Sequence, residues 1–345
     1  MKNCKVTLIL VATICALLCC PSDARAQEKS APGTAAVHLV ITDAALREDS
    51  EFPPLQKEDI KLKMGKNVID PTELIPATGD RSALQLMILI DDILDSNIGN
   101  DLNDLQEFIK NLPDGAQVGI GYMSNAGISI AQNFTADREL AAKAIRLPRG
   151  TTSSMDSPYL SLISLVKGWP QQKVRREVIM ISDGIDRLRG ERPEPARTGS
   201  YNAGFAGPNN TPLVYHSMPT ISTDATNASE ISQRYNVIVF PIYSVGVGRA
   251  ARSDWDRQMG LSGLTKIADE TGGECFSLST TQPVSIKPYL DRVQKYLGNQ
   301  YYLVFQAQQK KKDSLQSVNI RTATKNSEIL AADKVWVPGP PQTEK

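Results

Sequence analysis

Residues 84–92 read LQLMILIDD, an almost unbroken apolar run that ends in two aspartates. Such a run is typical of a strand that is buried on both faces, as the central strands of a parallel sheet are. Residues 177–184 (EVIMISDG) form a similar run that also ends in an aspartate, and residues 237–245 (VIVFPIYSV) form a third. Ligands of such sheets bind beyond the carboxyl ends of the strands. The sequence therefore predicts an acidic edge there, with Asp91, Asp92 and Asp183 in it.

Segments with a helical spacing of apolar residues separate these runs, and Leu102, Leu105 and Ile109 fall on one such stripe. Residues 118–123 and 128–131 read as two strands joined by a tight turn, a hairpin at the edge of the sheet. The spacing predicts helices near residues 101–112, 135–145 (capped by Thr135), 158–168, 223–234, 261–271 and 284–297, and a short strand at 275–278. This alternation indicates an α/β fold, a doubly wound and mostly parallel sheet with helices on both faces.

Small β segments flank this domain, which we place at residues 83–298. An N-terminal segment, residues 37–82, contains apolar or alternating strands at 37–42 and 60–64. A C-terminal segment, residues 299–338, contains three, at 301–306, 317–322 and 335–337, and a tail of 339–345 follows. Residues 187–220 carry many Pro, Gly, Asn and Arg without an apolar period. A loop of that length is functional or disordered in most compact domains.

The first 26 residues have the pattern of a secretory signal. Lys2 and Lys5 precede an apolar run from Val6 to Cys20, and Ala24-Arg25-Ala26 offers the small residues that a signal peptidase requires. Residues 27–36 then read as a flexible leader. We expect an exported protein, periplasmic or secreted, that has no membrane span after cleavage. Lipid attachment at Cys19 or Cys20 remains an alternative.

The composition excludes several classes of function. The formal net charge is zero, whereas a nucleic-acid-binding protein shows a basic excess or stripe. Two histidines exclude a site built from several histidines. Cys275 is the only cysteine after residue 20, and no base lies near it in the sequence, so we expect a small buried side chain and not a nucleophile.

Four features in order make residues 83–298 similar to a von Willebrand factor type A (VWA) domain, which has a Rossmann-like fold. The first two are the aspartate loop of residues 90–95 (IDDILD) and the strand end of residues 181–184 (ISDG). The third is residues 239–248 (VFPIYSVGVG), which resemble the penultimate strand of the family. The fourth is residues 264–276 (LTKIADETGGECF), which resemble its ending of a helix, Thr-Gly-Gly and a strand. The flanking β segments resemble those of exported bacterial proteins of the same superfamily.

The resemblance implies a site for Mg²⁺ at the strand ends, similar to a metal-ion-dependent adhesion site. The family's loop reads Asp-x-Ser-x-Ser, and here Asp91 matches the aspartate, Ile93 replaces the first serine and Asp95 the second. Asp183 matches the aspartate of the third loop, and Thr151 or Thr152 the threonine. Because isoleucine offers no oxygen to a hard cation, the motif is degenerate. Either a weak site survives on Asp91, Asp95, Thr151 and Asp183, or the site is lost; we expect no tightly bound metal.

The resemblance also implies a protein-interaction module, for adhesion or as a scaffold, that binds a partner through the strand-end face. The partner is unknown, and a carboxylate on it is one candidate for the contact. Asp92 and Trp255 are the candidate partner-binding residues. A permanent subunit of an envelope or secreted assembly is the alternative function. We expect no enzyme: a Mg²⁺-dependent phosphatase of the Asp-x-Asp kind is excluded by Ile93, and a phosphoacceptor like a response regulator lacks the required lysine.

Overall fold

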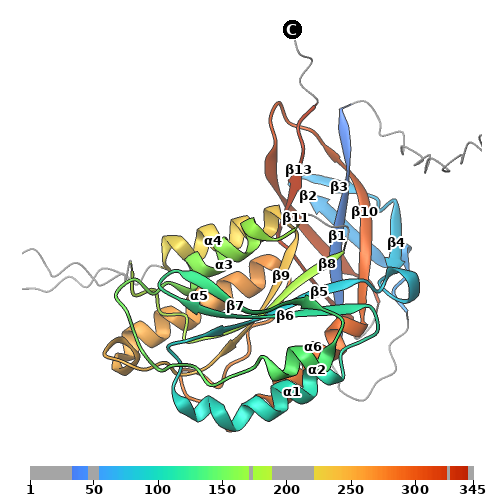
Figure 1. Cartoon of the computed structure of the whole chain (residues 1–345). Helices are drawn as coiled ribbons and strands as arrows, with labels where there is room; N and C mark the ends of the chain where they lie inside the picture. The colour runs from blue at the N-terminus through green and yellow to red at the C-terminus, as the bar shows by residue number, and fades with distance from the viewer. Residues whose placement is uncertain (1–32, 46–53, 171–173, 189–220, 325–326, 341–345) are drawn as a thin grey trace, which may run out of the picture.

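The computed structural model describes residues 33–45, 54–170, 174–188, 221–324 and 327–340 (Figure 1). The signal-like residues 1–26, most of the leader, residues 189–220 of the long loop and residues 341–345 of the tail lie outside this part of the chain. No helix within the described part is long and apolar enough to cross a membrane.

A five-stranded sheet forms the centre of the α/β domain, in the order β7-β6-β5-β8-β9. Three of its four neighbouring strand pairs are parallel, and β6 and β7 are the antiparallel pair. Side chains of β5 enter two different apolar clusters, Ile88 on one face and Leu89 on the other. The strands are β5 (Leu84–Asp91), β6 (Ala116–Ser124), β7 (Gly127–Thr135), β8 (Arg175–Ser182) and β9 (Val237–Tyr243). The predicted α/β fold with a mostly parallel sheet is confirmed.

Helices cover both faces of this sheet (Figure 1). One face packs against α1 (Leu102–Lys110), α2 (Arg138–Lys143) and α6 (Lys287–Gly298), and the other against α3 (Pro158–Gly168), α4 (Thr223–Arg234) and α5 (Asp254–Thr271). The α/β domain also contains two short 3-10 helices, η3 (Ser96–Asp101) and η4 (Ala250–Arg252).

Three local predictions need correction. Helix α5 begins at Asp254, seven residues before the predicted start, because the Ser253 side chain accepts a hydrogen bond from the backbone N–H of Asp256 and caps it. Asp137, not Thr135, caps α2, since its carboxylate accepts from the backbone N–H of Leu140. The predicted strand at 275–278 is reduced to two isolated bridges, one between Phe276 and Ile242 and one between Leu278 and Thr281.

The flanking segments pair with each other across almost the whole length of the chain. Strand β1 (Thr34–Ala45) begins three residues before the predicted strand and pairs with β10 (Gln300–Gln308), which follows α6. Two four-stranded antiparallel sheets result, in the orders β12-β1-β10-β4 and β13-β11-β2-β3, with a third apolar cluster between them. The remaining elements are η1 (Lys57–Asp59), β2 (Ile60–Met64), β3 (Asn67–Ile69), β4 (Glu73–Pro76), η2 (Gly79–Arg81), β11 (Ser314–Thr322), β12 (Ser327–Ala331) and β13 (Lys334–Val337). Strand β12 is an addition to the three predicted C-terminal strands.

This β unit joins the α/β domain where the central strands begin. The guanidinium of Arg175, at the start of β8, donates to the carbonyl of Ser82, the carbonyl of Leu297 and the side chain of Gln300. The carboxyl ends of the central strands therefore lie at the opposite end of the domain, away from the β unit.

Candidate functional site: the strand-end face

Two neighbouring strands end in carboxylates at the same edge of the sheet. Strand β5 ends at Asp91, and Asp183 follows the last residue of β8. The parallel register pairs Ile90 with Ile181, which sets the two strand ends side by side. The structure thus brings together two of the four residues predicted as metal ligands.

Asp91 is 3% exposed and is bonded within the protein. Its Oδ2 accepts a hydrogen bond of 2.7 Å from the hydroxyl of Ser182, and its Oδ1 lies 3.4 Å from the backbone N–H of Ile93. Burial and the nearby charge of Asp183 raise the pKa of Asp91 to about 8. This carboxyl therefore holds its proton at neutral pH in the folded chain.

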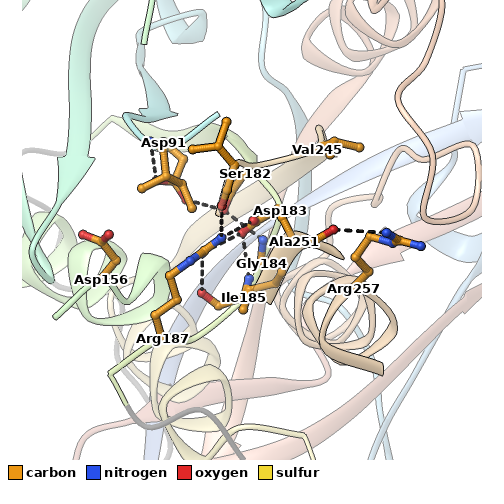
Figure 2. Close-up of polar contacts among 12 residues, drawn as sticks. Asp91, Asp156, Ser182, Asp183, Gly184, Ile185, Arg187, Val245, Ala251 and Arg257 are labelled. Carbon is orange, nitrogen blue, oxygen red and sulfur yellow. Dashed lines mark hydrogen bonds and ion pairs between the residues drawn. The ribbon is translucent and has the colours of Figure 1, made fainter. Parts of the chain in front are cut away.

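Asp183 is fully buried and pairs with Arg187 (Figure 2). Nη2 of Arg187 lies 2.7 Å from Oδ2 of Asp183 and Nη1 lies 3.3 Å from Oδ1, a bidentate geometry. The backbone N–H of Ile185 donates to Oδ1 as well, at 3.0 Å. Burial by itself lowers the pKa of Arg187, but the charge and the hydrogen bonds of Asp183 oppose this, and the pKa is raised.

Two loops close over this ion pair. The backbone N–H of Asp95, after β5, donates to the carbonyl of Val245, after β9, and Val247 donates back to the carbonyl of Ile93. Gly246 lies between them, and a Cβ there would be 2.1 Å from Oδ2 of Asp183. Only glycine lets the loop pass this close, so the two loops shield Asp183 from the outside.

The arrangement does not fit a Mg²⁺ ion. Arg187 offers donors and no acceptor, so it cannot be a ligand, and it already supplies positive charge where a metal would. Ile93 packs into the interior, and the carboxylate of Asp95 caps η3 by accepting from the backbone N–H of Asn97 at 2.9 Å. Thr151 is exposed. Within the described residues, no three Asp, Glu, His or Cys side chains form a group that could hold a metal ion.

Thr152, the other candidate threonine, is also exposed but lies against the loop that follows β9. A Cβ on Gly248 would be 3.1 Å from its Oγ1.

A second ion pair lies beside the first. Asp92 is 3% exposed, and its two carboxylate oxygens accept from Nη1 and Nη2 of Arg146 at 2.7 and 3.0 Å. It also accepts from the backbone N–H of Arg149 at 2.9 Å, and the Arg146 guanidinium lies 3.7 Å from the centre of the Tyr122 ring. Burial raises the pKa of Asp92, but the bonds to Arg146 and Arg149 outweigh it and leave the pKa lowered. Asp92 therefore holds the segment 146–150 over the sheet edge.

The outer surface of this face differs from the predicted acidic edge. Asp91, Asp92 and Asp183 lie at the predicted edge, but all three are buried and bonded within the protein, so they add no acidic surface and Asp92, a predicted partner-binding residue, is not exposed. Arginines are exposed instead in the loops around them, at Arg149, Arg249 and Arg252. Large apolar side chains exposed in the same loops or next to them are Leu147, Met155, Trp255, Leu278 and Val284. We call this outer surface the strand-end face.

The arginines are the residues of this site that sequence reasoning missed. The spacing Asp183-x-x-x-Arg187 carried little signal, because the residues between do not form a helix. The run Arg146-Leu147-Pro148-Arg149 was a better signal, since it precedes Gly150 and the candidate threonines.

The sequence matches no protein-family model and no curated protein. Several solved structures are similar to it. An aerotolerance-related membrane protein from Bacteroides fragilis shares 12% identity over 62% of this chain and 98% of its own, with a TM-score of 0.40. A von Willebrand factor type A protein from Catenulispora acidiphila shares 12% identity over 92% of this chain and 76% of its own, with a TM-score of 0.40. The ArnB paralogue VWA2 from Sulfolobus acidocaldarius shares 11% identity over 90% of this chain and 76% of its own, with a TM-score of 0.35. VWA domains are thus among the structures this chain resembles, as the four motifs predict.

Proposed function

We propose that this chain is a protein-interaction module, for adhesion or as a scaffold, that binds a partner through the strand-end face without a metal ion. The ion pair of Arg187 with Asp183 carries the proposal. A family-type site would offer a metal ion to a carboxylate of the partner. Here the guanidinium of Arg187 supplies the positive charge in place of the metal, and it is buried under two joined loops.

The chemistry of the exposed residues indicates the kind of partner. Arg149, Arg249 and Arg252 present positive charge around the face, and Trp255 and Met155 present apolar area. Arginine and aromatic side chains are enriched in the centres of protein interfaces, where lysine is depleted. We infer a partner protein with carboxylates around an apolar patch.

Export of the chain is part of the same proposal, and it rests on the signal-like residues 1–26. We also propose that the chain is not an enzyme. The carboxylates at the strand ends are bonded within the protein, and burial raises the pKa of the Cys275 thiol to about 11, which disfavours the nucleophilic thiolate.

Site-specific photo-crosslinking in the native host tests this proposal. A photoreactive phenylalanine analogue replaces Met155 or Trp255 on the strand-end face, and Val68, an exposed apolar residue of β3, as the control position. We expect the same partner to be linked at both face positions and not at Val68, with a yield that EDTA leaves unchanged. Reversing charge with Arg149→Glu and Arg252→Glu should abolish the product. Equal linkage at Val68, or loss of the product in EDTA, would contradict the proposal.

A further inference from the structure

A separate cavity of about 570 Å³ lies at the other end of the α/β domain, where it meets the β unit. Its wall is built from residues 36–39 of β1, Arg176 of β8, the end of α4 with Tyr235 and Asn236, and Val335 and Trp336 of β13. The volume is within the range of small-molecule sites. The cavity is remote from the strand-end face, because Arg176 pairs with Val237 at the start of β9.

The charged side chains of the lining are both basic. Arg176 and Arg234 line the cavity, and none of the described residues that line it is an aspartate or a glutamate. Within the part of the chain that the structure describes, no carboxylate compensates Arg176, and burial lowers the pKa of its guanidinium. A cavity with two guanidinium groups and no counter-charge attracts an anion.

The hydrogen bonds of Arg176 are incomplete. Its Nε and Nη1 are buried without a partner among the described residues. The preceding residue, Arg175, points to the opposite face of β8. Its Nη1 and Nη2 donate to three acceptors, and its Nε alone has no partner among the described residues. A buried polar atom without a partner costs free energy, so this difference between adjacent arginines calls for a missing acceptor near Arg176.

The second guanidinium is held in position by an aromatic ring. The Arg234 guanidinium lies 4.2 Å from the centre of the Trp336 ring. The nearby Glu230 pairs with Lys334 at 3.8 Å, and no ion pair involves Arg234 in the described part of the chain. Its donors therefore stay available at the cavity wall.

The wall contains polar groups besides the arginines. Gln233 is 4% exposed, and its Nε2 donates to Glu270 and Asp333, but its Oε1 is buried without a partner. Strand β12 pairs with β1 only from Ile41 onward, so among the described strands β10 alone pairs with residues 36–39, on one edge. The other edge offers backbone N–H and C=O groups at the cavity.

We propose that this cavity binds a small organic molecule through an oxyanion group, a carboxylate or a phosphate. Arg176 and Arg234 bind the oxyanion, since the planar guanidinium matches both groups with two parallel hydrogen bonds. Gln233 and the free edge of β1 bind the polar remainder of the ligand, and Trp336 forms the apolar wall. This proposal is independent of the function proposed for the strand-end face.

Calorimetric titration of the purified chain with citrate and with inorganic phosphate, at constant ionic strength, tests the proposal. We expect at least one probe to bind with a dissociation constant below about 1 mM. Tighter binding of citrate would indicate a carboxylate site, and tighter binding of inorganic phosphate a phosphate site. Arg176→Gln and Arg234→Gln should each weaken binding at least tenfold, whereas Arg321→Gln, an exposed arginine of β11, should not change it.

A far-UV circular dichroism spectrum and a cooperative thermal unfolding transition establish that each variant is folded. If Arg176→Gln does not fold, Arg234→Gln decides alone, because its side chain lies at the wall and not in the core. Affinities that are equal in wild type and both variants, or no binding of either probe at 10 mM, would overturn the proposal.

Discussion

The guanidinium of Arg187 lies 2.7 Å from Oδ2 of Asp183, a carboxylate only four residues earlier in the chain. Both side chains are buried, at 8% and 1% exposed, and both follow the carboxyl end of β8. The positive charge that a metal ion would bring to this edge of the sheet thus comes from the polypeptide. The stability of the strand-end face should then depend on an arginine.

Replacing this arginine should destabilise the chain strongly. Arg187→Gln leaves the buried carboxylate of Asp183 without its cation, and breaking a buried ion pair costs about 3–5 kcal/mol. Equilibrium unfolding in urea measures the loss.

Arg149→Gln is the matched control for that change. Its side chain is 68% exposed and lies 3.5 Å from Asp92, so the loss should be below about 1 kcal/mol. Equal losses from the two substitutions would show that the Arg187 pair is not a buried interaction.

The raised pKa of Asp91 should make the free energy of unfolding decrease as the pH rises. Burial and the charge of Asp183 raise its pKa from 3.8 to about 8, so between these values the folded chain keeps a proton that the unfolded chain has lost. Stability therefore decreases from about pH 4 to about pH 8 and levels off above. Asp91→Asn should remove this contribution, so its gain in stability over wild type should grow by on the order of 4 kcal/mol between pH 5 and pH 8, at about 1.4 kcal/mol per pH unit.

The comparison with Asp91→Asn is needed because Glu177 titrates in the same range. Burial raises its pKa to about 7, and the sign of its effect on stability is the same. Urea unfolding at pH 5 and pH 8 in both chains isolates Asp91. A parallel pH dependence in wild type and variant would contradict the assignment.

Gly246 should tolerate no side chain. A Cβ there would lie 2.1 Å from Oδ2 of Asp183, and the contact would separate Asp183 from Arg187 or move the loop after β9. We expect Gly246→Ala to cost about 1–3 kcal/mol, as overpacking does. Gly168→Ala, where a Cβ would contact nothing within 4 Å, should change stability by less than about 0.5 kcal/mol. Thermal unfolding of the two variants measures the difference, and a neutral Gly246→Ala would contradict the close approach.

The central sheet was predictable because its signal is local. The apolar run of residues 84–90 is long enough to require burial on both faces, and the turn at Asn125 and Ala126 specifies the hairpin. Both turn residues adopt positive φ, as a two-residue hairpin turn of the primed type requires.

The pairing of β1 with β10 was not predictable in the same way. Thr34 lies opposite Gln308, and nothing in either local pattern specifies a partner so far along the chain. The strands themselves were recognisable, and their assembly depends on where the α/β domain between them places the two ends.

The candidate site was predictable in its carboxylates and not in their partners. Asp91 and Asp183 follow apolar runs, so their position at the strand ends follows from the pattern. Arg187 belongs to an irregular loop, where sequence spacing does not determine direction, and its contact with Asp183 depends on the loops that close over it. The predicted ligands consequently do not form one site. Asp95 caps a helix, Thr151 is exposed, and Asp183 belongs to a buried ion pair.

The most direct test of the central claim is thermal unfolding of the purified chain in EDTA and then in 10 mM Mg²⁺. A site with a dissociation constant of about 0.1 mM would add about 2.7 kcal/mol, which is several degrees for a domain of this size. Because Arg187 already supplies the positive charge at Asp183, we predict the same midpoint in both conditions. A rise of several degrees that Asp183→Ala abolishes would show that a metal, and not Arg187, completes this site.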